Sequence, residues 1–557
     1  FMTAVTKEIM SLYRVDGIFS NRWDGSGLCY CEHCVKNFRA ASGLALPRPG
    51  DHESESYFQY TVWRQKRLFE LWRLWDAEIK KINPGAAFIA NAGGGALSDL
   101  DMKTIGELAP TLFADRQARR GLMPPWMNGK NGKEYRATMG RKAIGGIFSM
   151  GVEEPYRWKD SVQGAEEIRL WVADGIAHDL RPWFTKFNAK VIDHRWTKVI
   201  EDIYGWHHAN ERYLRNEQSL ARVALVYSQQ TATFYGGGQA RAKVEDHALG
   251  FYQALIEARV PFDMVHDQLL GQVSQYKTLI LPNIAALSNA QCEQLRAFVR
   301  NGGSLIATHE TSLYDEWGKR RADFGLADLF GASYAGRVDR DVHNSYLNIE
   351  RENGAYHPLV RGLEDATRII NGLNWVHTKP AGAAGPRPLT LVPSYPDLPM
   401  EQVWARVPHT DTPGAYVRQH GAGRVVYFPF DLDRTFWEVL SPDHGRLLRN
   451  ALAWVHAEEQ PLQVTGAGVL DVSLWSQKNS VTAHLVNLTN PMLMKGPVRE
   501  VIPSPPQTVH LRVPAGRKIK QVSLLVSRRK PTTRIQGQSV TIELPSIGLH
   551  EVIAVDC

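Results

Sequence analysis

Apolar and polar positions along the first 215 or so residues of the chain alternate between two patterns. Short apolar runs typical of strands are separated by longer amphipathic stretches typical of helices. The pattern predicts strands at residues 15–20, 87–91, 111–114, 144–149 and 181–187, and helices at 57–82, 103–108, 132–142, 163–177 and 196–215. Strands that alternate with helices in this way predict a parallel sheet with helical crossovers.

Polar and acidic residues recur just after these predicted strands. They are Asn21, Asp24, Asn91, Asp115, Glu153, Glu154 and Asp193. A (β/α)₈ TIM barrel carries its chemistry at the carboxyl ends of its strands, so a barrel is the predicted fold of residues 1–218. Only five strands are visible, so either three are missed or the N-terminal part of the barrel is missing. The chain opens inside an amphipathic helix and shows no signal-peptide pattern. The protein is expected to be soluble, but this end of the chain does not indicate its compartment.

The pattern changes twice further along the chain. From residue 221, the buried apolar runs VALV, LILP and LIAT alternate with helices, which predicts a second α/β domain over residues 219–460 with a doubly wound, flavodoxin-like sheet. From about residue 462, six short strands follow one another without helices. Residues 461–557 are therefore predicted to form a β-sandwich.

Composition narrows the possible partners. The 65 Lys and Arg exceed the 58 Asp and Glu by only seven, and this excess is scattered, so neither nucleic acid nor an anionic membrane is predicted as a partner. No apolar window approaches the roughly 18 residues that a membrane helix needs. The 16 tryptophans are more informative, because carbohydrate sites often stack sugars on indole rings, although most tryptophans are core residues.

Three of the five cysteines, Cys29, Cys31 and Cys34, fall within six positions. Three thiolates this close together can converge on one tetrahedral Zn²⁺, and because cysteine-rich sites are typically closed, a structural zinc is predicted rather than a catalytic one. The fourth ligand is not identified, since Cys292 and Cys557 lie in other predicted domains. The alternative is a loop with three reduced thiols.

The order of these features resembles the β-galactosidases of glycoside hydrolase family 42. The resemblance is strongest where a strand ends in Asn21 and is followed by the motif CYCEHC and by Phe38, and it continues through residues 166–179 (EEIRLWVADGIAHD). Residues from 221 onward resemble the trimerisation domain of the family, a flavodoxin- or amidotransferase-like unit, and the terminal sandwich resembles its last small domain. The resemblance implies a glycosidase that acts on a carbohydrate and assembles as a homotrimer.

The chain departs from the family at both catalytic positions. The family has Asn-Glu at the end of strand four, where this chain has Asn21-Arg22, and arginine cannot exchange a proton at working pH. The stretch that matches the family's nucleophile places Met150 or a neighbour at that position. Glycoside hydrolysis needs two carboxyl groups, and the predicted ones are Asp24 with Glu153 or Glu154. The alternative is that these three residues only form turns.

The remaining candidates surround the same predicted edge and would bind the substrate. They are Asn21, Arg22, Trp23, Asn91, Asp115, Trp183 and His194. The sequence therefore predicts a glycoside hydrolase for a small, β-linked saccharide or glycoside. The alternative is a catalytically inactive carbohydrate-binding or scaffold protein that has kept the barrel and lost its acid/base residue.

Overall fold

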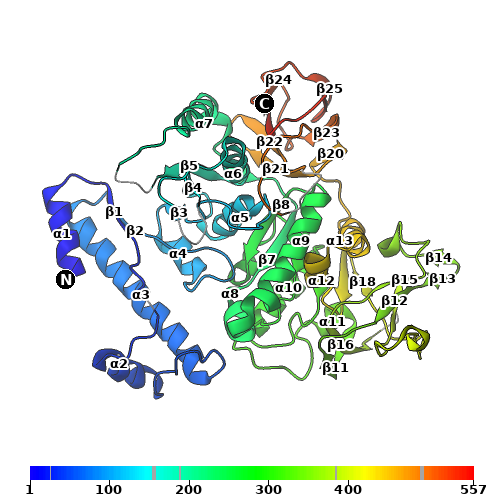
Figure 1. Cartoon of the computed structure of the whole chain (residues 1–557). Coiled ribbons are helices and arrows are strands. Elements are labelled where there is room, and N and C mark those ends of the chain that lie inside the picture. Colours follow the sequence, from blue (N-terminus) through cyan, green and yellow to red (C-terminus); the bar gives the residue numbers. More distant parts are fainter. Residues whose placement is uncertain (26, 153–157, 187–189, 383–384, 490–494) are drawn as a thin grey trace. The chain divides into compact units, whose positions relative to one another are not determined.

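The computed structural model describes residues 1–25, 27–152, 158–186, 190–382, 385–489 and 495–557 (Figure 1). The chain divides into two compact units. Unit 1 comprises Phe1–Leu220 and Pro461–Cys557, and unit 2 comprises Ala221–Gln460. No helix among the described residues has the length and apolar character needed to cross a membrane. The assignment of three separate domains, with boundaries at residues 218 and 460, stays a prediction.

Strands form at all five stretches predicted in the first part of unit 1. They are β1 (Gly17–Ser20), β2 (Ala87–Ala90), β3 (Leu112–Ala114), β4 (Ile144–Ser149) and β5 (Leu180–Thr185). β1 pairs with β2 and β4 pairs with both β3 and β5, and every pairing is parallel. The described residues of this first part of unit 1 thus contain five parallel strands in two sheets, so the mixed α/β class is confirmed, whereas a closed barrel of eight strands is not observed among them.

Helices precede and follow these strands. They are α1 (Met2–Leu12), α2 (Glu32–Ser42), α3 (Glu55–Ile82), α4 (Met102–Leu108), α5 (Met127–Met139), α6 (Ala165–Ala177) and α7 (Thr197–Asn210). The Ser54 hydroxyl caps α3 by accepting a hydrogen bond from the Tyr57 N–H at 3.1 Å. Trp72 and Ile79 of α3 are buried in one apolar cluster with Phe88 of β2. This packing fixes the long helix against the strand whose end carries Asn91.

The second part of unit 1 is an antiparallel β-sandwich. Its strands are β6 (Gln218–Ser219), β20 (Leu462–Gly466), β21 (Leu470–Ser476), β22 (Ser480–Asn487), β23 (Gln507–Arg512), β24 (Gln521–Leu524), β25 (Thr532–Gln536), β26 (Ser539–Leu544) and β27 (His550–Asp556). They form two sheets, in the orders β20-β23-β26-β25 and β24-β27-β22-β21-β6. One apolar cluster draws buried side chains from both sheets, as expected of a sandwich core.

Unit 2 is built on a sheet of six strands in the order β18-β19-β10-β9-β7-β8. Their bounds are β7 (Val223–Tyr227), β8 (Phe262–His266), β9 (Thr278–Leu281), β10 (Ser304–Thr308), β18 (Tyr416–His420) and β19 (Gly423–Phe428). All pairings are parallel except that of β18 with β19. Counted along the chain, the parallel strands lie in the order 2-1-3-4-5, which also occurs among doubly wound sheets.

Helices and a group of additional strands complete unit 2. The helices are α8 (Gln229–Thr231), the π-helix η2 (Ala232–Gly236), α9 (Asp246–Glu257), α10 (Asn289–Arg300), α11 (Ala327–Phe330), α12 (Leu432–Val439) and α13 (Pro442–Val455). The additional strands are β11 (Ala332–Asp339), β12 (Tyr346–Ile349), β13 (Arg351–Glu352), β14 (Ala355–Tyr356), β15 (Arg368–Ile370), β16 (Trp375–Pro380) and β17 (Leu389–Val392). β11 and β16 form an antiparallel ribbon, and β15, β12 and β17 form a small antiparallel sheet.

Candidate functional site

Three of the predicted site residues meet at the carboxyl ends of β1, β2 and β3. The Asn91 side-chain amide, just beyond β2, donates one hydrogen bond to Asn21 Oδ1 at 3.0 Å and another to Asp115 Oδ2 at 3.2 Å. Asn21 follows β1 and Asp115 follows β3. Parallel strands bring their carboxyl ends to one edge, so residues 70 and 24 positions away from Asn91 become its neighbours. We call Asn21, Asn91 and Asp115 the strand-end cluster.

Backbone and side-chain contacts hold the strand-end cluster in place. The Asn91 backbone N–H donates to Ser20 O at 3.0 Å, and the Asn91 carbonyl accepts from the Trp23 indole N–H at 3.0 Å. The other carboxylate oxygen of Asp115 accepts from the Gln117 amide at 2.7 Å. Two amide donors therefore orient the Asp115 carboxylate, while the residue itself stays exposed. Asp115 is thus positioned to contact a ligand at this edge.

Arg22 and Asp24 lie in the loop after β1. Arg22 is exposed and adopts a left-handed backbone with φ of 51°, which is uncommon for a residue other than glycine. Asp24 lies beside Arg64 of α3: the Arg64 guanidinium donates to the Asp24 carbonyl at 3.0 Å and lies 3.9 Å from its carboxylate. The predicted catalytic Asp24 therefore has a cationic partner on the helix side of its loop.

The two tryptophans predicted to stack on a sugar occupy different environments. Trp23 is only 7% exposed, and its ring packs edge-on against Trp72 and Phe88, so it is a core residue that offers no open face. Trp183 of β5 is 36% exposed and lies against Phe113, with ring centroids 4.4 Å apart. Of these two, only Trp183 has an accessible surface for stacking.

Two further predictions concern the loops after β4 and β5. Glu153 and Glu154 lie outside the described residues, so their distance from Asp24 or Asp115 is not part of the structure. His194 is exposed in the loop after β5. Its neighbour Asp193 accepts two hydrogen bonds from Arg195 Nε at 2.9 and 3.0 Å, and this arginine lowers the pKa of Asp193 to about 2. Asp193 is therefore an ionised partner of Arg195 rather than a proton donor.

Sequence reasoning missed the residues that support the site. Gln117 and Arg64 were not predicted, although each contacts a predicted residue directly. A signal for Gln117 was present, since it lies two positions beyond Asp115 at the same strand end. No sequence signal marked Arg64 as a site residue, because it lies within a long predicted helix far along the chain from Asp24.

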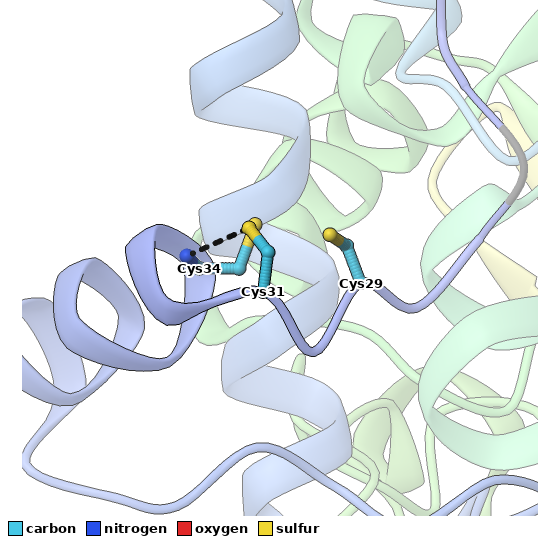
Figure 2. A group of neighbouring side chains, drawn as sticks. All are labelled: Cys29, Cys31 and Cys34. Carbon is cyan, nitrogen blue, oxygen red and sulfur yellow. Dashed lines mark hydrogen bonds between the residues drawn. The ribbon is translucent and has the colours of Figure 1, made fainter.

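The three clustered cysteines lie together at the start of α2. Figure 2 shows Cys29 in the loop before the helix, Cys31 at its N-cap and Cys34 in its first turn. Their sulfur atoms all lie within 4.8 Å of one another, and Cys31 Sγ accepts a hydrogen bond from the Cys34 N–H at 3.5 Å. That N–H is the main cause that lowers the pKa of Cys31. Partial burial, followed by the neighbouring thiols, raises the pKa of Cys34 to about 12.

This arrangement fits a zinc ion. Sulfurs bound to one tetrahedral Zn²⁺ at about 2.3 Å lie roughly 3.8 Å apart, which is compatible with the observed spacing. Among the described residues, no fourth histidine, cysteine or carboxylate joins the group. His33 is highly exposed, and its ring lies 3.7 Å from the Glu32 carboxylate. The described part of the chain thus offers three of the four ligands that a closed site would need.

Comparisons with known proteins agree with this architecture. Residues 221–340 match the family described as "Beta-galactosidase trimerisation domain". A β-galactosidase, BglY, from Alicyclobacillus acidocaldarius is 23% identical over 142 residues, which is 24% of this chain. That match spans only 20% of the length of this curated relative.

Solved structures resemble the whole chain. An α-L-fucosidase (isoenzyme 2) from Paenibacillus thiaminolyticus superposes with a TM-score of 0.77 at 18% identity, covering 100% of this chain and 79% of its own. A β-galactosidase from Bacillus circulans sp. alkalophilus superposes with a TM-score of 0.74 at 15% identity, and the match covers 100% of this chain and 82% of that protein. At these identities the likeness shows the fold alone. The predicted resemblance of the chain to the β-galactosidases of glycoside hydrolase family 42 is confirmed.

Proposed function

We propose that the protein is a glycoside hydrolase that acts on a small, β-linked saccharide or glycoside at the carboxyl ends of β1–β5. The observation that carries this proposal is the Asn91 amide, which joins Asn21 and Asp115 from neighbouring strand ends. An exposed, oriented carboxylate beside amide groups suits contact with sugar hydroxyls and with the bond to be cleaved. The names of the relatives, β-galactosidase and α-L-fucosidase, support a glycosidase of this class.

Two carboxyl groups must flank the glycosidic bond. Asp115 is our first candidate, because its hydrogen-bond partners among the described residues are amides and not cations. The second is Glu153 or Glu154, which follow β4 by four and five positions along the chain. We assign Asp24 to positioning rather than proton transfer, since Arg64 lies against both its carbonyl and its carboxylate. Arg22 and Trp183 would contact the substrate from the same edge.

We further propose that Cys29, Cys31 and Cys34 hold a structural zinc. The ion would connect the loop after β1 to the start of α2 and thereby fix the chain that carries Asn21 and Asp24. A closed, sulfur-rich site of this kind supplies stability rather than a reactive water.

Hydrolysis of nitrophenyl glycosides tests the proposed activity. The panel contains the β-D-galactoside and the α-L-fucoside, assayed between pH 5 and 8. We expect turnover of at least one substrate and a decrease in kcat/KM of about 10²-fold or more in Asp115→Asn. Asp16→Asn is the matched control, because it makes the same change in an exposed residue just before β1, at the opposite end of the strand. Full activity of Asp115→Asn would contradict the assignment.

A second candidate function is carbohydrate binding without hydrolysis. It is favoured by Arg22, which stands where the family 42 β-galactosidases that this chain resembles have their acid/base glutamate. Arginine cannot transfer a proton at working pH. The same assay separates the two functions when it is combined with calorimetry. Binding of a saccharide that is lost in Asp115→Asn, with no turnover of any glycoside, would identify a binding protein.

A further inference from the structure

Unit 2 contains a cavity that the proposed active site does not involve. Its volume is about 1100 Å³, and it lies between the β11–β16 ribbon and the small sheet β15-β12-β17. Asp339 and Trp375 line it from the ribbon. Leu391 of β17 and Ser345, which directly precedes β12, line it from the side of the small sheet. Ligand-binding cavities commonly have volumes of about 300–1000 Å³, so this one is large enough for a mono- or disaccharide. Most of its lining lies beyond the residues that match the trimerisation domain.

The polar groups on the ribbon side are held in fixed positions. His377 lies 2.7 Å from one carboxylate oxygen of Asp339, and Arg337 donates to the other at 2.5 Å. The next residue along, Arg340, donates to the buried Glu310 at 2.7 Å. Glu310 in turn accepts hydrogen bonds from two tyrosines, Tyr235 at 2.5 Å and Tyr314 at 3.0 Å. A supporting layer of this kind orients side chains before a ligand arrives.

Arg340 retains hydrogen-bonding capacity toward the cavity. Its side chain is 43% exposed, and only one of its five N–H groups has a hydrogen bond among the described residues, the bond to Glu310. The remaining donors belong to a guanidinium whose position is already fixed. This combination suits a ligand that offers several oxygen acceptors.

The aromatic part of the lining supplies an unsatisfied donor. Trp375 is 2% exposed, and its ring stacks on Phe430 at a centroid distance of 5.9 Å. Within the described part of the chain, its indole N–H has no acceptor. A buried polar group without a partner costs free energy, so a ligand oxygen that reached this N–H from the cavity would remove that cost. Tyr395, which also lines the cavity, stacks against Tyr346 and adds a planar surface.

The charges of the lining select against an anion. Arg337 and Arg340 are each paired with a carboxylate, which largely balances their positive charge. Asp341 and Asp397 also line the cavity, and neither has an ion pair or hydrogen bond among the described residues, so both would repel an anion. Hydroxyl groups can donate to these carboxylates and accept from the Arg340 and Trp375 N–H groups. The lining is therefore complementary to a neutral, polyhydroxylated molecule.

We propose that this cavity is a second saccharide-binding site, separate from the strand-end cluster. It would hold a neutral mono- or disaccharide, with Trp375 and Arg340 as donors and Asp341 and Asp397 as acceptors. The proposal does not require the protein to hydrolyse glycosides.

Isothermal titration calorimetry on the full chain tests this site. The probes are D-galactose, D-glucose, L-fucose and a thio-linked galactosyl disaccharide, none of which the protein can hydrolyse. Sodium galacturonate and spermidine serve as the anionic and cationic comparisons. All titrations are carried out in the Asp115→Asn background, so that binding at the strand-end cluster is weakened.

We expect at least one neutral probe to bind more tightly than either ionic compound. Its affinity should fall about tenfold or more in Asp397→Asn and in Trp375→Phe, which keeps the ring and removes the N–H. Asp411→Asn is the matched control, since this exposed carboxylate lies outside the lining and should leave the affinity within about twofold.

Three results would overturn the proposal. The first is that none of the four neutral probes binds. The second is that a neutral probe binds with an affinity that neither cavity variant changes. The third is that galacturonate or spermidine binds more tightly than the sugars. Circular dichroism spectra of Asp397→Asn, an exposed substitution, establish that any loss of binding is not a loss of folding. Failure of the glycoside assay leaves these outcomes unchanged, so the two proposals are tested separately.

Discussion

At the scale of single residues, His309 of unit 2 is a buried histidine whose ring has no hydrogen-bond partner among the described residues. It directly follows β10, is 1% exposed and has a left-handed backbone with φ of 52°. Neither ring nitrogen has a hydrogen-bond partner among the described residues, and the ring stacks on His247 at 5.7 Å. Burial lowers the pKa of His309 to about 4, against the opposing effect of Glu310 and Asp431. The folded chain therefore keeps this ring neutral.

This burial predicts a loss of stability in acid. Between the pKa of an unfolded histidine, about 6.5, and the folded value of about 4, the unfolded state binds more protons, so stability falls as the pH decreases. One pKa unit corresponds to about 1.4 kcal/mol, which gives roughly 3 kcal/mol at pH 4, or about 6–12 °C in the melting midpoint of a unit of this size.

His309→Asn should remove most of this pH dependence, because asparagine tolerates a left-handed backbone and does not titrate. The measurement is the melting midpoint by circular dichroism at pH 7, 5.5 and 4. His52→Asn, at an exposed position, should retain the dependence of the parent chain. An equal fall of the midpoint in His309→Asn and the parent chain would contradict this assignment.

The cysteine cluster predicts a bound metal. Elemental analysis of the purified protein should find about one zinc per chain, and Cys31→Ser should reduce it to near zero, because two sulfurs cannot retain a tetrahedral ion. Removal of the ion with a chelator should also lower the melting midpoint, since metal binding contributes to folding. Cys557→Ser, outside the cluster, is the control. A metal-free protein whose midpoint is insensitive to chelator would exclude the zinc.

Parts of the candidate site could be predicted from the sequence because strand ends are visible in it. Asn21, Asn91 and Asp115 each follow a run of apolar residues, and the topology of parallel strands brings such positions together. Side-chain direction could not be predicted. Trp23 follows β1 as Asn21 does, yet its ring enters the core, and nothing in the local pattern distinguishes the two.

At the scale of elements, apolar periodicity locates buried strands and misses exposed ones. β7, β9 and β10 are buried throughout and were predicted from their apolar runs. β25 was missed because all five of its residues are exposed and lack alternation. β6 has two residues and exists only through its pairing with β21, which lies about 255 positions further along the chain. Long-range pairing of this kind leaves no local signal.

Close packing of helices makes one glycine critical in unit 1. A Cβ atom on Gly106 of α4 would lie 2.2 Å from the Thr138 carbonyl oxygen of α5. We expect Gly106→Ala to cost about 1–3 kcal/mol, because the neighbouring backbone would have to move. Gly205 of α7 has open space around it, so Gly205→Ala should stabilise the chain by about 0.5–1 kcal/mol through helix propensity. Melting midpoints that do not separate the two variants would contradict this packing.

At the scale of the whole molecule, unit 1 is assembled from two distant stretches of chain. Its sandwich contacts the α/β part through a buried group in which His178 lies 2.8 Å from the Asp471 carboxylate, 293 positions away. Lys133 lies 3.9 Å from the other oxygen of Asp471. Burial raises the pKa of the neighbouring Asp174 well above its ordinary value. Asp471 and Lys133 could not be connected with Asp174 and His178 from the sequence, because the three predicted elements involved are far apart along the chain.

Self-association is the main prediction for the whole molecule. Residues 221–340 match a trimerisation domain, so we expect light scattering at micromolar concentration to give about three times the chain mass of 62.6 kDa. Contacts are expected on the helices of unit 2 and on the region 310–400, because both faces of the central sheet are covered. A mass of one chain across this concentration range would contradict the prediction.

We expect a sugar to bind at the strand-end cluster of unit 1, where the proposed activity is located. A crystal structure of the protein with a galactose-type iminosugar tests it most directly, because such compounds mimic the charge that develops in glycoside hydrolysis. We predict density for the iminosugar ring within hydrogen-bonding distance of Asp115 and Asn91, with a second carboxylate on its opposite side. A strand-end cluster that remains empty at saturating inhibitor, while the compound binds elsewhere or nowhere, would contradict the account.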